Sequence, residues 1–252
     1  MIDTSRIAGL NQIINDEQHI IIGCAVTHTQ IVHDEQIIRL GTCLVESCGV
    51  IGGPQVRNVA TLAGNVAHAM PAGDGSIGLL ALDGEVEVAD KSGCRWMPLR
   101  DSFLGPGKSV IDPHRAILTR LRFCPTGAGE GSAFTRIMRP QGVALPMFSM
   151  AARMQLDDRD NISALRISLG PAGPVPYLAE PAMELLVGGP AVAGQFDKAV
   201  DAVLSAVPLR SSKYRATREY RAEMIRTHLP LILARAAGRA RSGHAVPEGV
   251  GV

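Results

Sequence analysis

A glycine-rich stretch from Gly52 to Gly78 constrains this chain more than any other part of its sequence. It contains six glycines, and its centre reads Thr61-Leu62-Ala63-Gly64-Asn65, in which small residues stand between a hydroxyl and an amide. Residues without bulk let the main chain come within hydrogen-bond distance of a ligand, and consecutive backbone N–H groups bind phosphate oxygens. The stretch therefore predicts a phosphate site, for which a diphosphate is a natural ligand.

Side chains around this loop add polar groups that suit a nucleotide cofactor. Thr61 brings a hydroxyl donor and Asn65 an amide, and the carboxylate of Asp74 can accept hydrogen bonds from ribose hydroxyls. The spacing matches neither GxGxxG nor GxxxxGKS/T, so the fingerprints of Rossmann and P-loop sites are missing. On spacing alone, a set of purely structural turns stays open as the alternative.

Length and composition indicate a packed globular protein. The chain has 252 residues, enough for one large domain or two modest ones. Apolar residues make up 46% and charged residues 19%, which allows a sizeable core. The formal net charge is +1 and aromatic residues are 4%, so neither nucleic acid nor an anionic membrane surface is an expected partner. No window reaches the ~18 uninterrupted apolar residues that a membrane helix needs.

The first half of the chain has a mixed α+β pattern. An apolar run at 19–23 and period-two alternation at 84–90 and 117–123 predict strands. Apolar residues at helical spacing predict a helix over 31–51. The segment 124–131 then combines a proline with three glycines, so we expect a first domain over 1–127.

The second half predicts an antiparallel meander covered by helices. Strand-like runs at 132–139, 147–156 and 162–170 are separated by turn residues. Helical patterns follow, and Thr227 is expected to cap the last helix with Pro230 in its first turn. A second domain is therefore expected over 128–240, followed by a flexible tail of Gly, Pro and small residues over 241–252.

The cysteines favour free thiols over disulfides or metal ligands. They are Cys24, Cys43, Cys48, Cys94 and Cys124. Their odd number and the lack of a CxxC pair predict neither a disulfide framework nor a zinc or iron–sulfur site. They are typical of core thiols in a cytoplasmic protein.

Two further features have simple structural interpretations. His28 is expected near a helix start. The segment 210–241 holds nine Lys or Arg against two Glu, which raises the question of a nucleic-acid face. The spacing of Arg215, Arg218 and Arg221 instead predicts charges on one solvated helix face, able to pair with a partner subunit.

The glycine-rich stretch also belongs to a longer pattern. Residues 51–58, IGGPQVRN, followed by 61–65, TLAGN, resemble the signature GxxQIRNxGTIGGN of the FAD-binding subunit of molybdenum hydroxylases. This is the family of the xanthine dehydrogenase and carbon monoxide dehydrogenase medium subunits. Further segments resemble the family in chain order: 22–28, 103–107, 117–121, 176–188 and 210–235. The resemblance covers residues 1 to about 240.

The resemblance implies a fold and a set of site residues. The expected fold is the second lobe of a PCMH-type FAD-binding domain, a mixed sheet with helices, followed by a carbon monoxide dehydrogenase flavoprotein C-terminal domain of antiparallel sheet plus helices. By resemblance, Thr61, Leu62, Ala63, Gly64 and Asn65 would hold the FAD diphosphate. Asp74 would lie against the ribityl or ribose hydroxyls, and Ile51 and Ile117 near the isoalloxazine. No catalytic residue and no metal ligand is expected.

The resemblance also implies a function that depends on partners. The chain would be an oxidoreductase subunit that passes electrons through FAD to NAD, a quinone or oxygen. The electrons would come from the iron–sulfur clusters of a [2Fe-2S] small subunit, which receives them from a molybdopterin-binding large subunit. The alternative is a truncated or flavin-free protein that only makes subunit contacts.

The chain departs from the family pattern in two places. Ala63 replaces the first glycine of TIGGN, and its methyl would cost about 1 kcal/mol if that position needed a positive φ. Residues 1–10 resemble a family segment that follows a first FAD-binding lobe, which carries the other diphosphate loop. We therefore expect a longer natural protein or a separately encoded lobe, without which a strand at Ile2 would be exposed.

Overall fold

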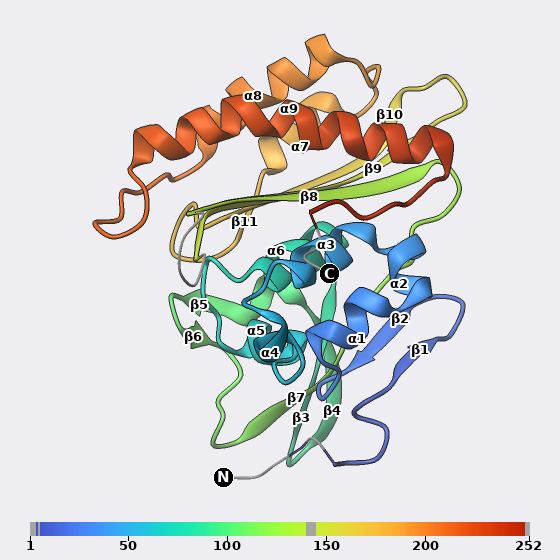
Figure 1. Ribbon diagram of the computed structural model, residues 1–252, viewed down its shortest axis with the longest axis vertical. Helices are drawn as coiled ribbons and strands as arrows, with labels where there is room; N and C mark the ends of the chain where they lie inside the picture. Colours follow the sequence, from blue (N-terminus) through green and yellow to red (C-terminus); the bar gives the residue numbers. More distant parts are fainter. Residues whose placement is uncertain (1–3, 5, 140–144, 250–252) are drawn as a thin grey trace.

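The computed structural model describes residues 4, 6–139 and 145–249, which form two stacked halves of mixed helices and sheets (Figure 1). A five-stranded sheet with short helices makes up one half, and a four-stranded sheet with long helices the other. This arrangement confirms the expected α+β class. The strand expected at Ile2 lies outside the described residues.

The first half is built around a five-stranded sheet in the order β1-β2-β7-β3-β4, with every neighbouring pair antiparallel. Its strands are β1 (Ile13–Asn15), β2 (Ile20–Gly23), β3 (Glu85–Asp90), β4 (Gly93–Pro98) and β7 (Ala116–Phe123). The predicted strands at 19–23, 84–90 and 117–123 are confirmed as β2, β3 and β7. A 3-10 helix (Leu99–Ser102), β5 (Phe103–Gly105) and β6 (Lys108–Ser109) connect β4 to β7.

The single helix predicted over 31–51 is wrong, because the chain breaks there into three helices. They are α1 (His28–His33), α2 (Glu35–Leu40) and α3 (Thr42–Gly49). Asp34 ends α1 and starts α2, since its side chain accepts from the backbone N–H of Ile37 at 2.9 Å. Gly41 ends α2, where a Cβ atom would lie 2.7 Å from the ring of Phe123. The apolar residues of this segment do lie in helices. The Asp34 cap and the close approach of Gly41 to Phe123 divide the segment into three of them.

The second half confirms the predicted antiparallel meander. Its sheet has the order β11-β10-β9-β8, formed by β8 (Glu130–Met138), β9 (Pro146–Leu156), β10 (Ile162–Gly170) and β11 (Tyr177–Leu178). Three helices follow: α7 (Glu180–Leu186), α8 (Ala193–Ala206) and α9 (Arg218–Ser242). The helix α9 packs on β8 and β9, while α3 and α6 (Asp74–Ala81) of the first half pack on the same sheet. The sheet thus lies between the two sets of helices (Figure 1).

The start predicted for the last helix is also wrong. The cap is Thr217, whose hydroxyl accepts from the backbone N–H of Tyr220 at 3.2 Å, and Thr227 and Pro230 lie inside α9. Pro230 supplies no N–H to the helix. The side chains of Leu229 and Ile232, before and after it in the chain, are buried in the second core, and the helix continues past the proline.

The basic face expected on this helix is partly buried. Arg221 is 1% exposed, and its guanidinium donates to the carbonyl oxygen of Arg210 at 2.6 Å. The prediction that Arg221 shares a solvated face with Arg218 is therefore wrong. The charged side chain can be buried because the carbonyl oxygen of Arg210 accepts its hydrogen bond. Helical spacing does not reveal this contact.

Two hydrophobic cores fill the halves, and the first one crosses between them. The first core contains most of the buried side chains up to Phe123, together with Phe134 of β8 and Ala151 of β9. The second core lies between the four-stranded sheet and the helices α7, α8 and α9. Side chains of the second sheet therefore complete the core of the first half.

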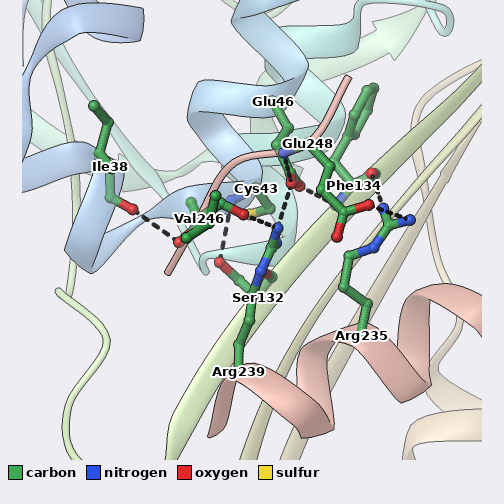
Figure 2. Close-up of polar contacts among 10 residues, drawn as sticks. Ile38, Cys43, Glu46, Ser132, Phe134, Arg235, Arg239, Val246 and Glu248 are labelled. Carbon is green, nitrogen blue, oxygen red and sulfur yellow. Dashed lines mark hydrogen bonds and ion pairs between the residues drawn. The ribbon is translucent and has the colours of Figure 1, made fainter. Parts of the chain in front are cut away.

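A buried ion pair joins the halves beside β8. Glu46 of α3 and Arg239 of α9 are 1% and 7% exposed, and Arg239 Nη2 lies 2.6 Å from Glu46 Oε1 (Figure 2). Three main-chain groups of β8 are bound by charged side chains there. Phe134 N–H donates to Glu46, Arg239 donates to Ser132 O, and Arg235 donates to Phe134 O.

The segment after α9 is bound to the same pair. Arg239 donates to Val246 O, and the backbone N–H of Glu248 donates to Glu46 Oε1 at 2.8 Å (Figure 2). The Glu248 carboxylate lies 2.9 Å from Arg235 Nη2. The segment expected to form a flexible tail thus includes Val246, bound to Arg239 seven residues earlier, and Glu248, bound to Glu46 about 200 residues earlier, which composition does not indicate.

Candidate functional site

The glycine-rich loop is anchored on the start of α1. Thr61 and Thr27 form an isolated antiparallel bridge, and the backbone N–H of His28 donates to Ala60 O at 3.0 Å. A side-chain hydrogen bond between Thr29 and Asn58, 2.7 Å long, fixes the preceding turn. These three contacts attach the loop to the first turn of α1 and its cap.

Thr61 caps the helix α5 (Leu62–Ala67) that follows the loop. Its hydroxyl oxygen accepts from the backbone N–H of Gly64 at 3.0 Å, which leaves the hydroxyl proton available to a ligand. Leu62 and Ala63 are buried, whereas Gly64 is exposed. Leu62 and Ala63 thus offer only main-chain N–H groups, which have no acceptor within the helix because they lie in its first turn.

The strain considered for Ala63 does not arise. Ala63 lies in the first turn of α5, where φ is negative, so its methyl group carries no left-handed penalty. The glycine that matters here is Gly64, where a Cβ atom would lie 3.3 Å from Thr61 Oγ1 on an otherwise open surface. Small, exposed backbone with N–H donors and a hydroxyl is a donor set that fits a diphosphate.

Asn65 acts mainly as a cap for α6. Its Oδ1 accepts from the N–H and the hydroxyl of Ser76 at 3.0 and 3.1 Å. The helix needs this bond because its N-cap residue, Gly73, has no side chain. A Cβ atom on Gly75 would lie 2.6 Å from Leu62, so the glycines let α5 and α6 pack closely. Of Asn65, only the amide NH₂ group remains for a ligand.

Asp74, at the start of α6, lies at the junction of the two halves. It is 4% exposed, its Oδ1 accepts from the hydroxyl of Ser149 at 2.6 Å, and its Oδ2 lies 3.3 Å from Arg136 Nη1. Burial raises the pKa of Asp74 to about 6, although Arg136, Ser149 and Arg215 oppose the rise. Sequence reasoning found Asp74 but missed these partners, which lie more than 60 residues away.

Raising the pH through about 6 is expected to destabilise the chain through Asp74. The folded-state pKa lies above the ordinary value of 3.8, so the folded chain binds this proton more tightly than the unfolded chain. The resulting stabilisation is complete below the ordinary pKa and is lost as the pH rises to about 6. At ~1.4 kcal/mol per unit of separation it amounts to about 3 kcal/mol.

Denaturant unfolding of the chain and of Asp74→Asn between pH 4 and 8 measures this contribution. The difference in unfolding free energy between the two proteins should change most between pH 4 and 6, in favour of the variant. A difference that stays constant with pH would show that Asp74 does not titrate in this range.

The two isoleucines lie in different parts of the first half, Ile51 after α3 and Ile117 on β7. Ile51 is half-buried after α3, and Arg57 donates to the carbonyls of Ile51 and Gly52 at 3.4 and 3.0 Å, just before α4 (Pro54–Arg57). Ile117, at the start of β7, is 43% exposed, and β7 packs against α5. Ile117 therefore lies on a strand that packs against α5, the helix that follows Thr61. Ile51 comes directly before the loop in the chain.

One residue near the loop has an environment that its position in the sequence did not indicate. His28 opens α1, as expected, but it is 1% exposed and its Nδ1 has no hydrogen-bond partner among residues 4, 6–139 and 145–249. Burial, assisted by Arg57, lowers its pKa to about 4, so the imidazole is neutral.

Within the described part of the chain, no three His, Cys, Asp or Glu side chains are grouped to hold a metal ion. No helix of that part is long and apolar enough to span a membrane.

Two family models match the chain in succession. The FAD binding domain in molybdopterin dehydrogenase matches residues 1–125, and the CO dehydrogenase flavoprotein C-terminal domain matches residues 132–236. The xanthine dehydrogenase FAD-binding subunit of Escherichia coli O157:H7 is 29% identical over 95% of this chain and 82% of its own length. The carbon monoxide dehydrogenase medium chain of Afipia carboxidovorans is 26% identical over 96% of this chain and 83% of its own.

Solved structures show the same fold. Carbon monoxide dehydrogenase from Oligotropha carboxidovorans matches with a TM-score of 0.82 and 24% identity, over 93% of this chain and 79% of that one. Quinoline 2-oxidoreductase from Pseudomonas putida 86 matches with a TM-score of 0.82 and 20% identity, over 92% and 79%. The motif, the paired domains and the fold agree: this chain is an oxidoreductase subunit with FAD as its cofactor, and it belongs to the FAD-binding medium subunits of the molybdenum hydroxylases.

Proposed function

We propose that this chain passes electrons from iron–sulfur clusters through FAD to an external acceptor. The observation that carries the proposal is the succession of the two matched domains, because it occurs along a chain whose relatives are FAD-binding subunits. FAD supplies the redox chemistry when bound, and the protein supplies binding, orientation and exclusion of water. The acceptor would be NAD, a quinone or oxygen.

The site residues divide this work among them. Thr61 and the first-turn N–H groups of α5 would bind the diphosphate, and Gly64 would let the main chain approach it. Asp74 would accept a hydrogen bond from a ribityl or ribose hydroxyl. Ile51 and Ile117 would cover the isoalloxazine and exclude water from it. The donor set around Thr61 and the exposure of Gly64 support this assignment.

The proposal also covers the partner subunits, the two domains and the cellular compartment. The partners would be a molybdopterin-binding large subunit and a [2Fe-2S] small subunit, since relatives are medium chains of dehydrogenases. Residues 1–127 would form the FAD-binding domain and 128–240 the second domain. All five cysteines are free thiols, which suits the cytoplasm.

Added FAD is expected to stabilise the full chain. At a ligand concentration 100 times Kd the gain is about 2.7 kcal/mol, which raises the Tm of a protein of this size by about 5 to 10 °C. Thermal unfolding with FAD, and with FMN as a control that lacks the adenylate moiety, measures this effect. A colourless chain that shows no rise in Tm with FAD would instead support the alternative, a flavin-free protein that only makes subunit contacts.

The assembly proposal has its own test. The chain, purified from its source through an affinity tag, is expected to bring with it a molybdopterin protein and an iron–sulfur protein. The isolated chain should oxidise neither purines nor aldehydes, because the proposed function assigns substrate oxidation to the molybdopterin-binding large subunit. Turnover of such a substrate by the lone chain, measured with an artificial electron acceptor, would contradict the assignment.

A further inference from the structure

The segment that carries Asp74 rests on the second sheet. Ser149 of β9 lies directly opposite Gly170 of β10 in the antiparallel register. A Cβ atom on Gly170 would lie 2.3 Å from Pro71 O, so the sheet approaches this segment main chain to main chain. Ser168 of β10 also donates to Ile77 O, three residues after Asp74 in α6, at 2.7 Å. The two strands thus form a support for residues 71–77.

The second sheet also sets the direction of the Asp74 carboxylate. Each of its oxygens has one partner from this sheet, Ser149 for Oδ1 at 2.6 Å and Arg136 for Oδ2 at 3.3 Å. Ser149 is fully buried, and only 4% of Asp74 is exposed. A carboxylate has about four lone-pair sites, so the two partners from this sheet leave lone pairs to accept from further donors.

We infer that Ser149 is a positioning residue for the flavin site, which holds the Asp74 carboxylate in the orientation that accepts a cofactor hydroxyl. The inference rests on the proposed function of Asp74 and extends it, because it assigns a part of flavin recognition to the second half of the chain. Ser149 acts through Asp74 and does not touch the cofactor.

The pKa of Asp74 is a readout of the role of Ser149, because a purely structural role of Ser149 would not change it. Charged and polar groups from several elements set this pKa. Arg136 on β8, Arg215 ahead of α9, Ser149 on β9 and the Cys48 thiol on α3 interact with it. The Ser149 hydrogen bond lowers the pKa of Asp74 against the effect of burial. Removing it should move the titration of Asp74, and with it the pH dependence of flavin binding, to higher pH.

The test compares Ser149→Ala with Ser168→Ala in the full chain. Ser168 is a matched control, because it is also fully buried, lies on the adjacent strand and donates to the same helix without contacting Asp74. Ser149→Ala should weaken FAD binding at pH 7 about tenfold and shift the midpoint of its pH profile upward. Ser168→Ala should keep the affinity within about twofold and the midpoint unchanged. Equal losses in both variants would reduce Ser149 to a structural role and overturn the inference.

A double-mutant cycle tests whether Ser149 acts through Asp74. In an Asp74→Asn background, Ser149→Ala should change FAD affinity by no more than about twofold. A loss that persists in this background would overturn the inference.

The inference and the proposed function can fail separately. If the wild-type chain binds no FAD, the proposed function fails, while the carboxyl NMR titration of Asp74 in the ligand-free chain still tests the role of Ser149. Ser149→Ala should raise this pKa and Ser168→Ala should leave it unchanged. An unchanged pKa in Ser149→Ala would overturn the inference, even if the chain binds FAD.

Discussion

A Gly64→Val variant of the full chain is expected to bind FAD at least about 100-fold more weakly while keeping its fold. Gly64 lies in the first turn of α5, and a Cβ atom there would already approach Thr61 Oγ1 to 3.3 Å. A branched side chain would keep a diphosphate away from the N–H groups of this turn and disturb the Thr61 cap. Hydrogen bonds to charged groups contribute about 1.5 to 3 kcal/mol each, so losing two of them accounts for the size of the effect.

The fold should tolerate the change because Gly64 is exposed and valine favours a helix more than glycine does. Ala67→Val is the matched control, since Ala67 is exposed in the same helix, one turn further from the loop. Isothermal titration with FAD and circular dichroism of both variants make the comparison. FAD binding by Gly64→Val at the wild-type level would show that the diphosphate lies elsewhere.

An Arg239→Met variant is expected to lose about 3 to 5 kcal/mol of unfolding free energy. Arg239 is the ion-pair partner of Glu46, with 2.6 Å between Nη2 and Oε1, and both side chains are buried (Figure 2). Removing one member of a buried pair leaves the other charge in a medium that solvates it poorly. The variant also loses the hydrogen bonds to Ser132 O and Val246 O.

Arg241→Met provides the control on the same helix. Its guanidinium pairs with Asp160 at 2.7 Å, but both side chains are about half exposed. Water can therefore solvate the Asp160 carboxylate once Arg241 is removed. Urea unfolding should therefore show a large loss for Arg239→Met and a much smaller one for Arg241→Met. Similar losses would mean that the buried pair does not hold the two halves together. A third variant, Glu46→Gln, should recover part of the stability in the Arg239→Met background, because it removes the uncompensated charge.

The sequence predicted the parts of this fold that depend on local patterns. The alternation at 84–90 and 117–123 identified β3 and β7, because a half-buried strand must alternate. The three runs after residue 131 identified the meander for the same reason. The motif at 61–65 located the loop, because small residues and Thr61 are needed at the start of α5.

The remaining features depend on contacts between distant residues. Gly41 breaks the predicted helix because the ring of Phe123 occupies the space beside it, and no periodicity contains that information. Ser149 and Arg136 meet Asp74 only after the second sheet has docked. The last helix is capped by Thr217, whereas Thr227, the cap expected from the sequence, lies inside α9.

The outer edge of β8 has a consequence for how this protein associates with others. An edge strand with unpaired main-chain groups is a template on which a strand of another chain can add. Here the side chains of Glu46, Arg235 and Arg239 already occupy main-chain groups of Ser132 and Phe134. An incoming strand would have to displace these charged side chains before it could bond to the main chain of Ser132 or Phe134. The four-stranded sheet is thereby protected from growing by strand addition along this stretch of β8, and aggregation through it is suppressed while the ion pairs persist.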